Sequence, residues 1–224
     1  MNHSSQLPID IKLSDSRPDR LKWVSICAGI LSAILGMVVL IGWYTHNANL
    51  IQVHRTFVPM QYNTALGFLL CGMAMVLILL EKFRPAALLA SIAGLIGLLT
   101  LAEYLFNINI GIDQLFMKHY ITVQTSHPGR MAPNTALCFV LTAGYILMMQ
   151  LREKLNHISV ISGITAALIL ALGATAFGSY LSGLHTAYGW GNLTRMAIHT
   201  SASFCILGIG ALNGFYLLMM KQPS

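Results

Sequence analysis

The chain has 224 residues, of which 56% are hydrophobic and only 9% are charged, and its formal net charge is +6. Soluble domains carry roughly 25% charged residues, so this composition excludes an ordinary soluble protein and indicates an integral membrane protein. The basic balance in such a chain reflects its orientation in the membrane and contact with anionic lipid head groups. We therefore expect the lipid bilayer as a partner and exclude nucleic acid.

Residues 1–22 form a polar lead-in rich in Ser and Pro. We expect a cytoplasmic tail without fixed structure here. Its length and its three aspartates argue against a cleaved signal peptide. The rest of the chain is predicted to be one membrane domain over residues 23–220, followed by a short cytoplasmic end at residues 221–224.

Six long apolar runs follow the lead-in, each close to the length of about 20 residues that a helix needs to cross a bilayer. They predict an all-α integral membrane protein with six transmembrane helices at Val24–Tyr44, Asn63–Leu80, Ala86–Leu105, Asn134–Gln150, Val160–Leu181 and Met196–Met220. Most of the 13 Lys and Arg residues fall on one side of this topology. That asymmetry places the N- and C-termini in the cytoplasm.

Each predicted span except those at Ala86–Leu105 and Val160–Leu181 contains one cysteine, namely Cys27, Cys71, Cys138 and Cys205. They form no CxxC pair and have no metal-ligand spacing. We interpret them as buried small apolar residues, and we expect no disulfide.

One motif of nine residues occurs three times, each time at the start of an even-numbered span. It reads MQYNTALGF at 60–68, MAPNTALCF at 131–139 and MAIHTSASF at 196–204. Tyr44 and Tyr180 stand equally far before the Met of their motifs, whereas Tyr104 stands farther from Met131, so the middle loop carries an insertion. We predict three parallel-repeat helical hairpins, at about residues 23–81, 86–150 and 160–220, around an axis near the membrane normal.

The helical period gives the motif an inward face. In the first copy Met60, Asn63 and Gly67 share one side of the helix, and the other copies repeat this pattern. The small residue four positions after the polar one allows close helix packing. We therefore expect the polar members to lie near one another at the extracytoplasmic mouth, and we take as sensing candidates Asn63, Asn134, His199, Met60, Met131 and Met196. In the alternative interpretation, Asn and Thr only satisfy free N–H groups at the helix starts.

Glu103 is the one carboxylate well inside an apolar run. A charge in a membrane is costly and is usually paired. We predict an ion pair with Arg130 or with Arg195, which precede the second and third motifs, and we include all three residues among the site candidates. Arginine beside a helix N-terminus is also suited to binding a small anion.

The insertion in the middle loop, NINIGIDQLFMKHY, contains a predicted short amphipathic helix led by Asp113, with Ile112, Leu115 and Phe116 buried. Such a helix is either a lid over the mouth of the bundle or an element that lies in the membrane interface.

Most of the eight histidines map to the extracytoplasmic side. Together with the methionines at similar depth, they could bind copper, another transition metal or haem, or they could titrate as a pH sensor. The metal or haem candidates are His199, His46, His185 and His127. In the alternative interpretation they are structural or solvated loop residues, because no pair has a strict ligand spacing.

Several stretches in the right order, among them GWYTH, AEYLFNINIGIDQLF, PGRMAPNTALCF and TRMAIHTSASF, resemble the six-helix N-terminal membrane region of bacterial sensor histidine kinases and diguanylate cyclases. The resemblance covers roughly residues 23–220. It implies a multi-pass protein of the bacterial inner membrane that takes part in signal transduction, as in two-component systems, usually as a homodimer. The cytoplasmic kinase or cyclase module of that family has no counterpart in this sequence.

These observations predict a membrane sensory input domain that detects a signal or ligand at its extracytoplasmic side and transmits it through the last helix. We expect no enzymatic activity of the domain itself, because no nucleophile and base pair or phosphate-binding loop is visible. A haem- or metal-binding redox membrane protein is the second hypothesis, and a small transporter is the third.

Overall fold

The computed structural model describes residues 17–121, 123, 125–151, 157–183 and 193–221. Within these ranges the chain is helical and has no strand. Its elements are α1 (Arg17–Tyr44), α2 (Ala48–Ile51), α3 (Tyr62–Leu79), α4 (Phe83–Phe106), the 3-10 turn η1 (Ile112–Gln114), α5 (Pro133–Leu151), α6 (His157–Ser182) and α7 (Ile198–Lys221).

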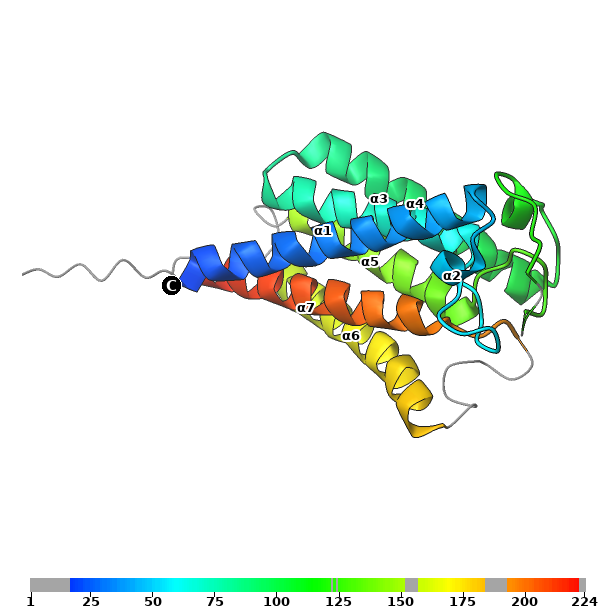
Figure 1. The fold of residues 1–224 in the computed structure, drawn as a ribbon. Coiled ribbons are helices and arrows are strands. Elements are labelled where there is room, and N and C mark those ends of the chain that lie inside the picture. Colours follow the sequence, from blue (N-terminus) through cyan, green and yellow to red (C-terminus); the bar gives the residue numbers. More distant parts are fainter. Residues whose placement is uncertain (1–16, 122, 124, 152–156, 184–192, 222–224) are drawn as a thin grey trace, which may run out of the picture.

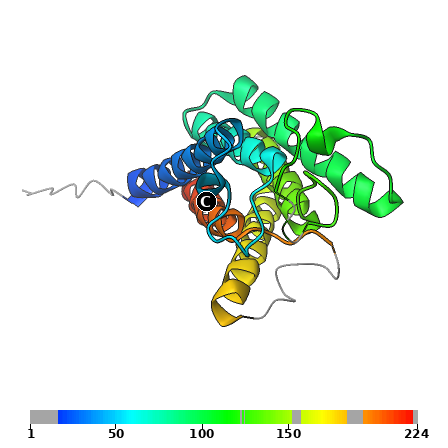
Figure 2. The ribbon, with the colours of Figure 1, turned by 45° about the vertical axis from the view of Figure 1, so that its right-hand side comes forward.

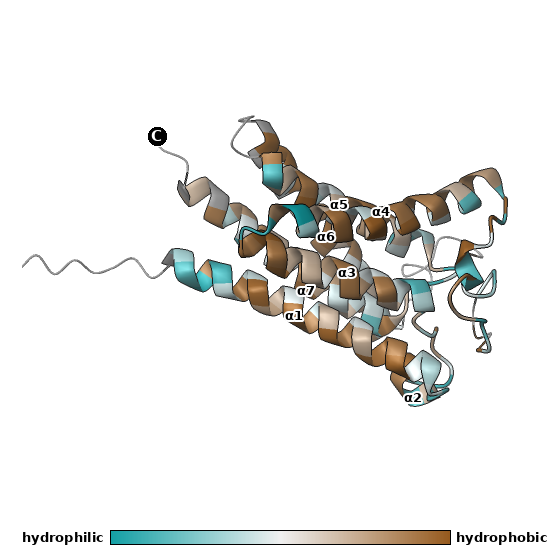
Figure 3. Cartoon of the chain, turned by 90° about the horizontal axis from the view of Figure 1, so that it is seen from above, coloured by the Kyte–Doolittle hydropathy of each residue, from teal (hydrophilic) through white to brown (hydrophobic). Residues whose placement is uncertain are grey.

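Six of these helices, α1, α3, α4, α5, α6 and α7, are long and apolar enough to cross a membrane. Figure 3 shows that the hydrophobic colouring follows their length, whereas the hydrophilic residues gather toward the ends and in the connections. The chain is therefore described as a multi-pass membrane protein. The predicted spans agree with these helices, with one correction at the N-terminal side. α1 begins at Arg17, so residues 17–22 are helical and not part of an unstructured tail.

Neighbouring helices in the chain form closely packed pairs, α1 with α3, α4 with α5 and α6 with α7. Further contacts of α1 with α7, α3 with α4 and α5 with α6 close the bundle into a ring (Figures 1 and 2). The three helices that begin with the motif, α3, α5 and α7, also contact one another. They are 56–61% buried over their membrane windows, against 28–44% for α1, α4 and α6. The motif helices are thus the inner ones.

The two ends of the bundle differ. We call the end that contains the first turns of α3, α5 and α7 the motif end. It also contains α2, η1 and the long connection between α4 and α5, whereas the start of α1 and the end of α7 lie side by side at the opposite end (Figure 1). α6 diverges from the other helices toward its C-terminal end (Figure 1).

Close packing of α1 against α3 depends on glycine. A Cβ atom built on Gly72 would lie 2.4 Å from the Gly29 carbonyl oxygen and 2.6 Å from the Ala33 nitrogen, both in α1. A Cβ on Gly36 would lie 2.5 Å from the Ala65 carbonyl oxygen in α3. Small residues let two membrane helices approach this closely.

The cysteines only partly follow the prediction. Cys71 and Cys138 are buried, Cys205 is half-buried, and all four thiols are free. Cys27 is exposed on the surface of α1, so the prediction of burial is wrong for this residue. It faces outward because the side of α1 that packs against α3 is occupied by its glycines and Ala33.

Candidate functional site at the motif end

The three motifs begin their helices at the same position. α3 starts at Tyr62, α5 at Pro133 and α7 at Ile198, each two residues after the Met of its motif. The first helical hydrogen bond is equivalent in each, from Ala65 to Gln61, from Ala136 to Ala132 and from Ser201 to Ala197. The motif therefore specifies where an inner helix begins.

The backbone carbonyl of each motif Met accepts a hydrogen bond from an aromatic side chain at the end of the preceding long helix. Tyr104 Oη donates to Met131 over 3.0 Å and Tyr180 Oη donates to Met196 over 2.7 Å. In the first motif the donor is Trp43 Nε1, which lies 2.9 Å from the Met60 carbonyl oxygen. The sequence spacing predicted that Tyr44 corresponds to Tyr180, and the contacts show that this is wrong. The Tyr44 hydroxyl does not bind the Met60 carbonyl but lies 2.9 Å from the Tyr62 hydroxyl.

The motif phenylalanines meet inside the bundle. The ring centroids of Phe68, Phe139 and Phe204 lie 5.1, 4.7 and 5.0 Å apart in the three pairs, and all three side chains are fully buried. Tilted and edge-on rings at such distances attract one another beyond simple contact. A Cβ on Gly67 would lie 2.6 Å from the Phe139 ring, so this small residue makes room for an aromatic side chain.

The polar members of the motif are buried but make different contacts. Asn63 Nδ2 donates to the Ile112 carbonyl over 2.8 Å, whereas Asn134 Oδ1 accepts from the Thr135 backbone N–H at 3.0 Å. Asn134 thus acts within its own helix start, as the structural interpretation expects, and Asn63 binds another segment. The methionine side chains of Met60, Met131 and Met196 belong to the hydrophobic core.

Apart from two carboxylates, four polar side chains at the motif end have buried atoms without a hydrogen-bond partner among the described residues, namely Gln61, His119, His199 and Ser203. Two of them stand at the starts of inner helices: Gln61, which is 2% exposed, and His199, whose two ring nitrogens are buried. The Ile51 backbone lies close enough to the His199 ring for a loose hydrogen bond, although its carbonyl already accepts from the N–H of Met60, the residue before Gln61. Buried polar groups in proteins nearly always have a partner, so a water or a ligand is expected at these two side chains.

A buried ion cluster joins α4 to the start of α5. Arg130 Nε lies 2.7 Å from Asp113 Oδ2 and 3.2 Å from Glu103 Oε2, and Arg130 Nη2 donates to the Ile108 carbonyl over 3.2 Å. The guanidinium also lies over the Tyr104 ring, 5.3 Å from its centroid. The predicted pair of Glu103 with Arg130 is confirmed, and the alternative partner Arg195 lies half-buried before α7.

Asp113 carries the second carboxylate of this cluster. Its pKa is raised to about 6, chiefly by burial, with Arg130 acting to lower it and the neighbouring Glu103 to raise it. Removing a carboxylate from water disfavours its charged form, which is the dominant cause here.

Residues 107–132, which we call the crossing segment, cover the motif end. In its described part, Ile112 accepts a hydrogen bond from Asn63 of α3. The ring of Tyr120 in the segment lies 4.8 Å from that of Trp43 in α1. The hydroxyl of Ser126 in the segment lies 3.0 Å from that of Thr194, which precedes α7. It therefore touches all three helical pairs, in keeping with the lid interpretation.

The local structure predicted for this segment needs correction. η1 is a single turn of 3-10 helix, not an amphipathic α-helix. Asp113 is the buried residue, Ile112 is half-buried, and Leu115 and Phe116 are 67% and 55% exposed. The reason is that Asp113 points toward Arg130, which turns the following apolar side chains outward.

The histidines proposed as metal or haem ligands are spread over the motif end. His46 stacks on Tyr120 with ring centroids 4.7 Å apart, and His127 Nδ1 lies 3.2 Å from the Ser126 hydroxyl. His185 lies outside the described residues. In the part of the chain that the structure describes, no group of three or more His, Cys, Asp or Glu side chains is arranged to hold a metal ion. A cofactor remains a prediction for these residues.

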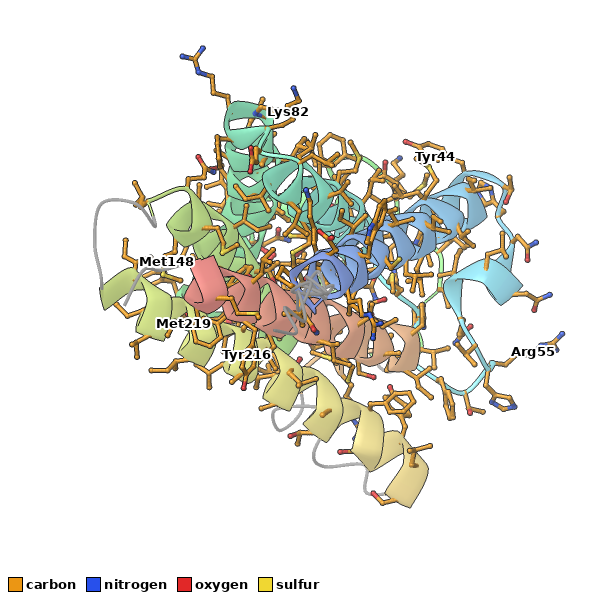
Figure 4. All side chains as sticks on the ribbon, turned by 90° about the vertical axis from the view of Figure 1, so that its left-hand side faces the viewer. Tyr44, Arg55, Lys82, Met148, Tyr216 and Met219 are labelled. Atoms are coloured by element: carbon orange, nitrogen blue, oxygen red, sulfur yellow. The ribbon has the colours of Figure 1, made fainter. Side chains whose placement is uncertain are left out.

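An open cleft of about 720 Å³ lies beyond the end of α1, lined mainly by polar residues that include His46, His54 and Arg55. Arg55 is exposed, and its side chain projects away from the bundle in Figure 4, as does that of Lys82 in the turn between α3 and α4. Arg55 is therefore not a member of the buried cluster around Arg130.

Sequence reasoning missed three features of this site: the central position of the motif phenylalanines, the Gln61 amide and the Asp113 carboxylate. The phenylalanine is constant in all three motifs, so the repeat contained the signal. The chain matches no family model, no curated protein and no solved structure. The resemblance to bacterial sensor regions thus stays a prediction from the motifs.

Proposed function

We propose that this chain is a sensory input domain of the bacterial inner membrane, which binds a ligand or responds to a signal at the motif end and passes a change of helix packing to a cytoplasmic kinase or cyclase module. In this proposal the domain has no catalytic role of its own and acts as a homodimer.

The observation that carries the proposal is a pair of buried polar groups, the Gln61 amide and the His199 ring. Gln61 has no hydrogen-bond partner among the described residues, and the ring nitrogens of His199 have only a loose contact with the Ile51 backbone. The two residues stand at the starts of two different inner helices. An orphaned buried donor or acceptor costs roughly 1–3 kcal/mol, so a binding partner at this place would be favoured. A ligand that bridges the two would act on the packing of α3 against α7.

We further propose that the three helical pairs are parallel repeats around an axis near the membrane normal. The equivalent helix starts, the aromatic donors to the three Met carbonyls and the triangle of phenylalanines support this arrangement. The excess of Lys and Arg at the opposite end supports an orientation with both termini in the cytoplasm.

α7 is suited to carry a change from one end to the other. It begins at the candidate site, and its backbone is held at the middle of the helix by two hydrogen bonds. Ser25 Oγ of α1 donates to the Gly210 carbonyl over 2.7 Å, and Tyr145 Oη of α5 donates to the Ala211 carbonyl over 2.7 Å. A shift of α7 therefore has to alter its contacts with α1 and α5. Binding at the candidate site can shift α7 only if the ligand binds one packing arrangement of the helices more tightly than another.

The test joins a cytoplasmic histidine kinase module to the end of the full chain and measures phosphoryl transfer to its response regulator in cells. We expect the fusion to be active, because the opposite end faces the cytoplasm, and we expect His199→Phe to change its basal output by about fivefold or more. Ile209→Ala is the matched control, since Ile209 is an exposed residue of the same helix. An output unchanged by His199→Phe, in a fusion that folds and inserts normally, would contradict the proposal.

A further inference from the structure

The ion cluster at the motif end contains two carboxylates and one guanidinium, all in side chains no more than 6% exposed. Arg130 contacts both acids through Nε. Glu103 Oε1 accepts a hydrogen bond from the Ile110 N–H at 2.9 Å. Glu103 Oε2 and Asp113 Oδ1 are buried and accept no hydrogen bond from any residue that the structure describes.

With all three groups ionised, the cluster has one more negative than positive charge. An excess charge removed from water is strongly disfavoured, and two neighbouring carboxylates relieve it by retaining one proton between them. Such a proton belongs to the pair of acids and not to either one alone. It would also supply the donor that the two free carboxylate oxygens lack.

We propose that Glu103 and Asp113 together hold one proton beside Arg130, and that this proton keeps the crossing segment docked on the motif end. When the proton leaves to solvent water, the buried excess charge favours release of the segment from α3 and α4. The inference concerns the docking of the segment and stands apart from the sensory role.

The contacts that would break are defined. Ile112, next to Asp113, accepts from Asn63 of α3, and Ile110 donates to Glu103 of α4. Gly129, beside Arg130, has φ +79°, and a Cβ on it would lie 2.5 Å from the Asp113 carbonyl oxygen. The two ends of the segment are thus packed against each other at the cluster, so opening the cluster loosens both.

Other titratable groups face the cluster or the docked segment. α4 contributes Tyr104 beneath Arg130, and His127 of the segment lies edge-on to Tyr104 at 6.4 Å. Trp43 of α1 packs 5.6 Å from His119 of the segment, and His46, just after α1, stacks on Tyr120 of the segment with ring centroids 4.7 Å apart. α3 contributes the neutral Asn63 and Tyr62, whose ring lies 6.1 Å from that of Phe116. The three histidines have to be separated from the acids in any test.

The direction of the pH dependence follows from Asp113. Its pKa in the folded protein is raised to about 6 by burial, above the ordinary value of 3.8. The docked segment therefore binds more protons than the released one between these two values. Docking is strongest below pH 4, weakens as the pH rises toward 6, and stays weakened above it.

Trp43 is a built-in reporter, because it is 1% exposed and packs against His119 and Tyr120 of the segment. The experiment uses the full chain in nanodiscs with Trp23→Phe and Trp190→Phe, so that Trp43 alone emits. We expect a red shift of its emission as the pH rises from about 3.5 to about 7.5, with a midpoint between about 4 and 6 and no further change above that range.

Single substitutions assign the transition. Asp113→Asn and Glu103→Gln should each abolish it, because either one leaves a single carboxylate opposite Arg130 and no excess charge. His46→Gln, His119→Gln and His127→Gln should leave it in place. The proposal is overturned if the emission is constant over this range, if the shift persists unchanged in Glu103→Gln or Asp113→Asn, or if it disappears with any of the three histidines. Should Asp113→Asn fail to fold, the result in Glu103→Gln decides.

Discussion

Arg130 is the residue on which the structure of the motif end most depends. Its side chain is fully buried, contacts Asp113 and Glu103, donates to a backbone carbonyl and lies over Tyr104. The planar guanidinium can serve all of these neighbours at once, which the point charge of a lysine could not. Removing it would leave two buried carboxylates without a counter-charge.

This arrangement predicts unequal effects of two substitutions on stability. Arg130→Met should lower the free energy of unfolding by about 3–5 kcal/mol, because it leaves buried charge uncompensated. Glu103→Gln should cost about 1 kcal/mol, since it removes one contact but leaves the neutral pair of Arg130 with Asp113. Unfolding of the purified protein in mixed micelles by increasing SDS measures both. Equal losses for the two variants would argue against the cluster.

Among the individual residues of the ion cluster, the sequence predicted the pair of Glu103 with Arg130 but not the third member. Glu103 stood out because an acid in an apolar run needs a partner, and Arg130 was the nearest candidate on the same side. Asp113 was not recognised as the second acid, because a polar residue in a loop gives no sign of burial. Gln61 was missed for a similar reason, because a polar residue just before a helix gives no sign in the sequence that it is buried.

Among the elements, the pair of α1 and α3 has the closest backbone approach. Gly29 and Gly72 face each other across this contact, and each would place a Cβ less than 3 Å from the carbonyl oxygen of the other. Where lipid provides no hydrophobic driving force, such packing contributes directly to helix association.

We predict that Gly72→Ala destabilises the protein by about 1–3 kcal/mol, as expected when an atom is forced into a tightly packed contact. Gly144→Ala in α5 is the matched control, because a Cβ there meets nothing within 4 Å. It should be neutral or stabilise by up to about 1 kcal/mol through helix propensity. The same SDS unfolding assay compares the two. A harmless Gly72→Ala would contradict the packing of α1 on α3.

The spans themselves were predictable from the sequence, since length and hydropathy determine where a helix can cross. What hydropathy could not provide is which side of each span faces inward. The motif correctly identified the three inner helices, but their inward face was inferred from the polar residue of the motif. The residue that reaches the centre of the bundle is the phenylalanine five residues later. The insertion that forms the crossing segment was recognised, but its contacts could not be predicted, because they come from α1, α3, α4 and the residues before α7.

In the molecule as a whole, three inner helices that begin with the same motif are surrounded by three outer ones. Figure 4 shows that Tyr216 and Met219 of α7, near the opposite end, lie toward the outside of the bundle. Both are exposed, and so is Met220. The inner helix α7 therefore comes to the surface where it leaves the bundle, which is where a cytoplasmic module would receive a shift of its position.

The central claim is that the motif helices meet around one point, and a double-mutant cycle between Phe68 and Phe204 tests it most directly. Their ring centroids are 4.7 Å apart, so the two Phe→Ala substitutions should be non-additive in the free energy of unfolding, by about 0.5–1.5 kcal/mol. The control cycle pairs Phe68 with the exposed Phe106 at the end of α4 and should be additive within about 0.5 kcal/mol. Additivity in both cycles would mean that the motif helices do not meet at their phenylalanines.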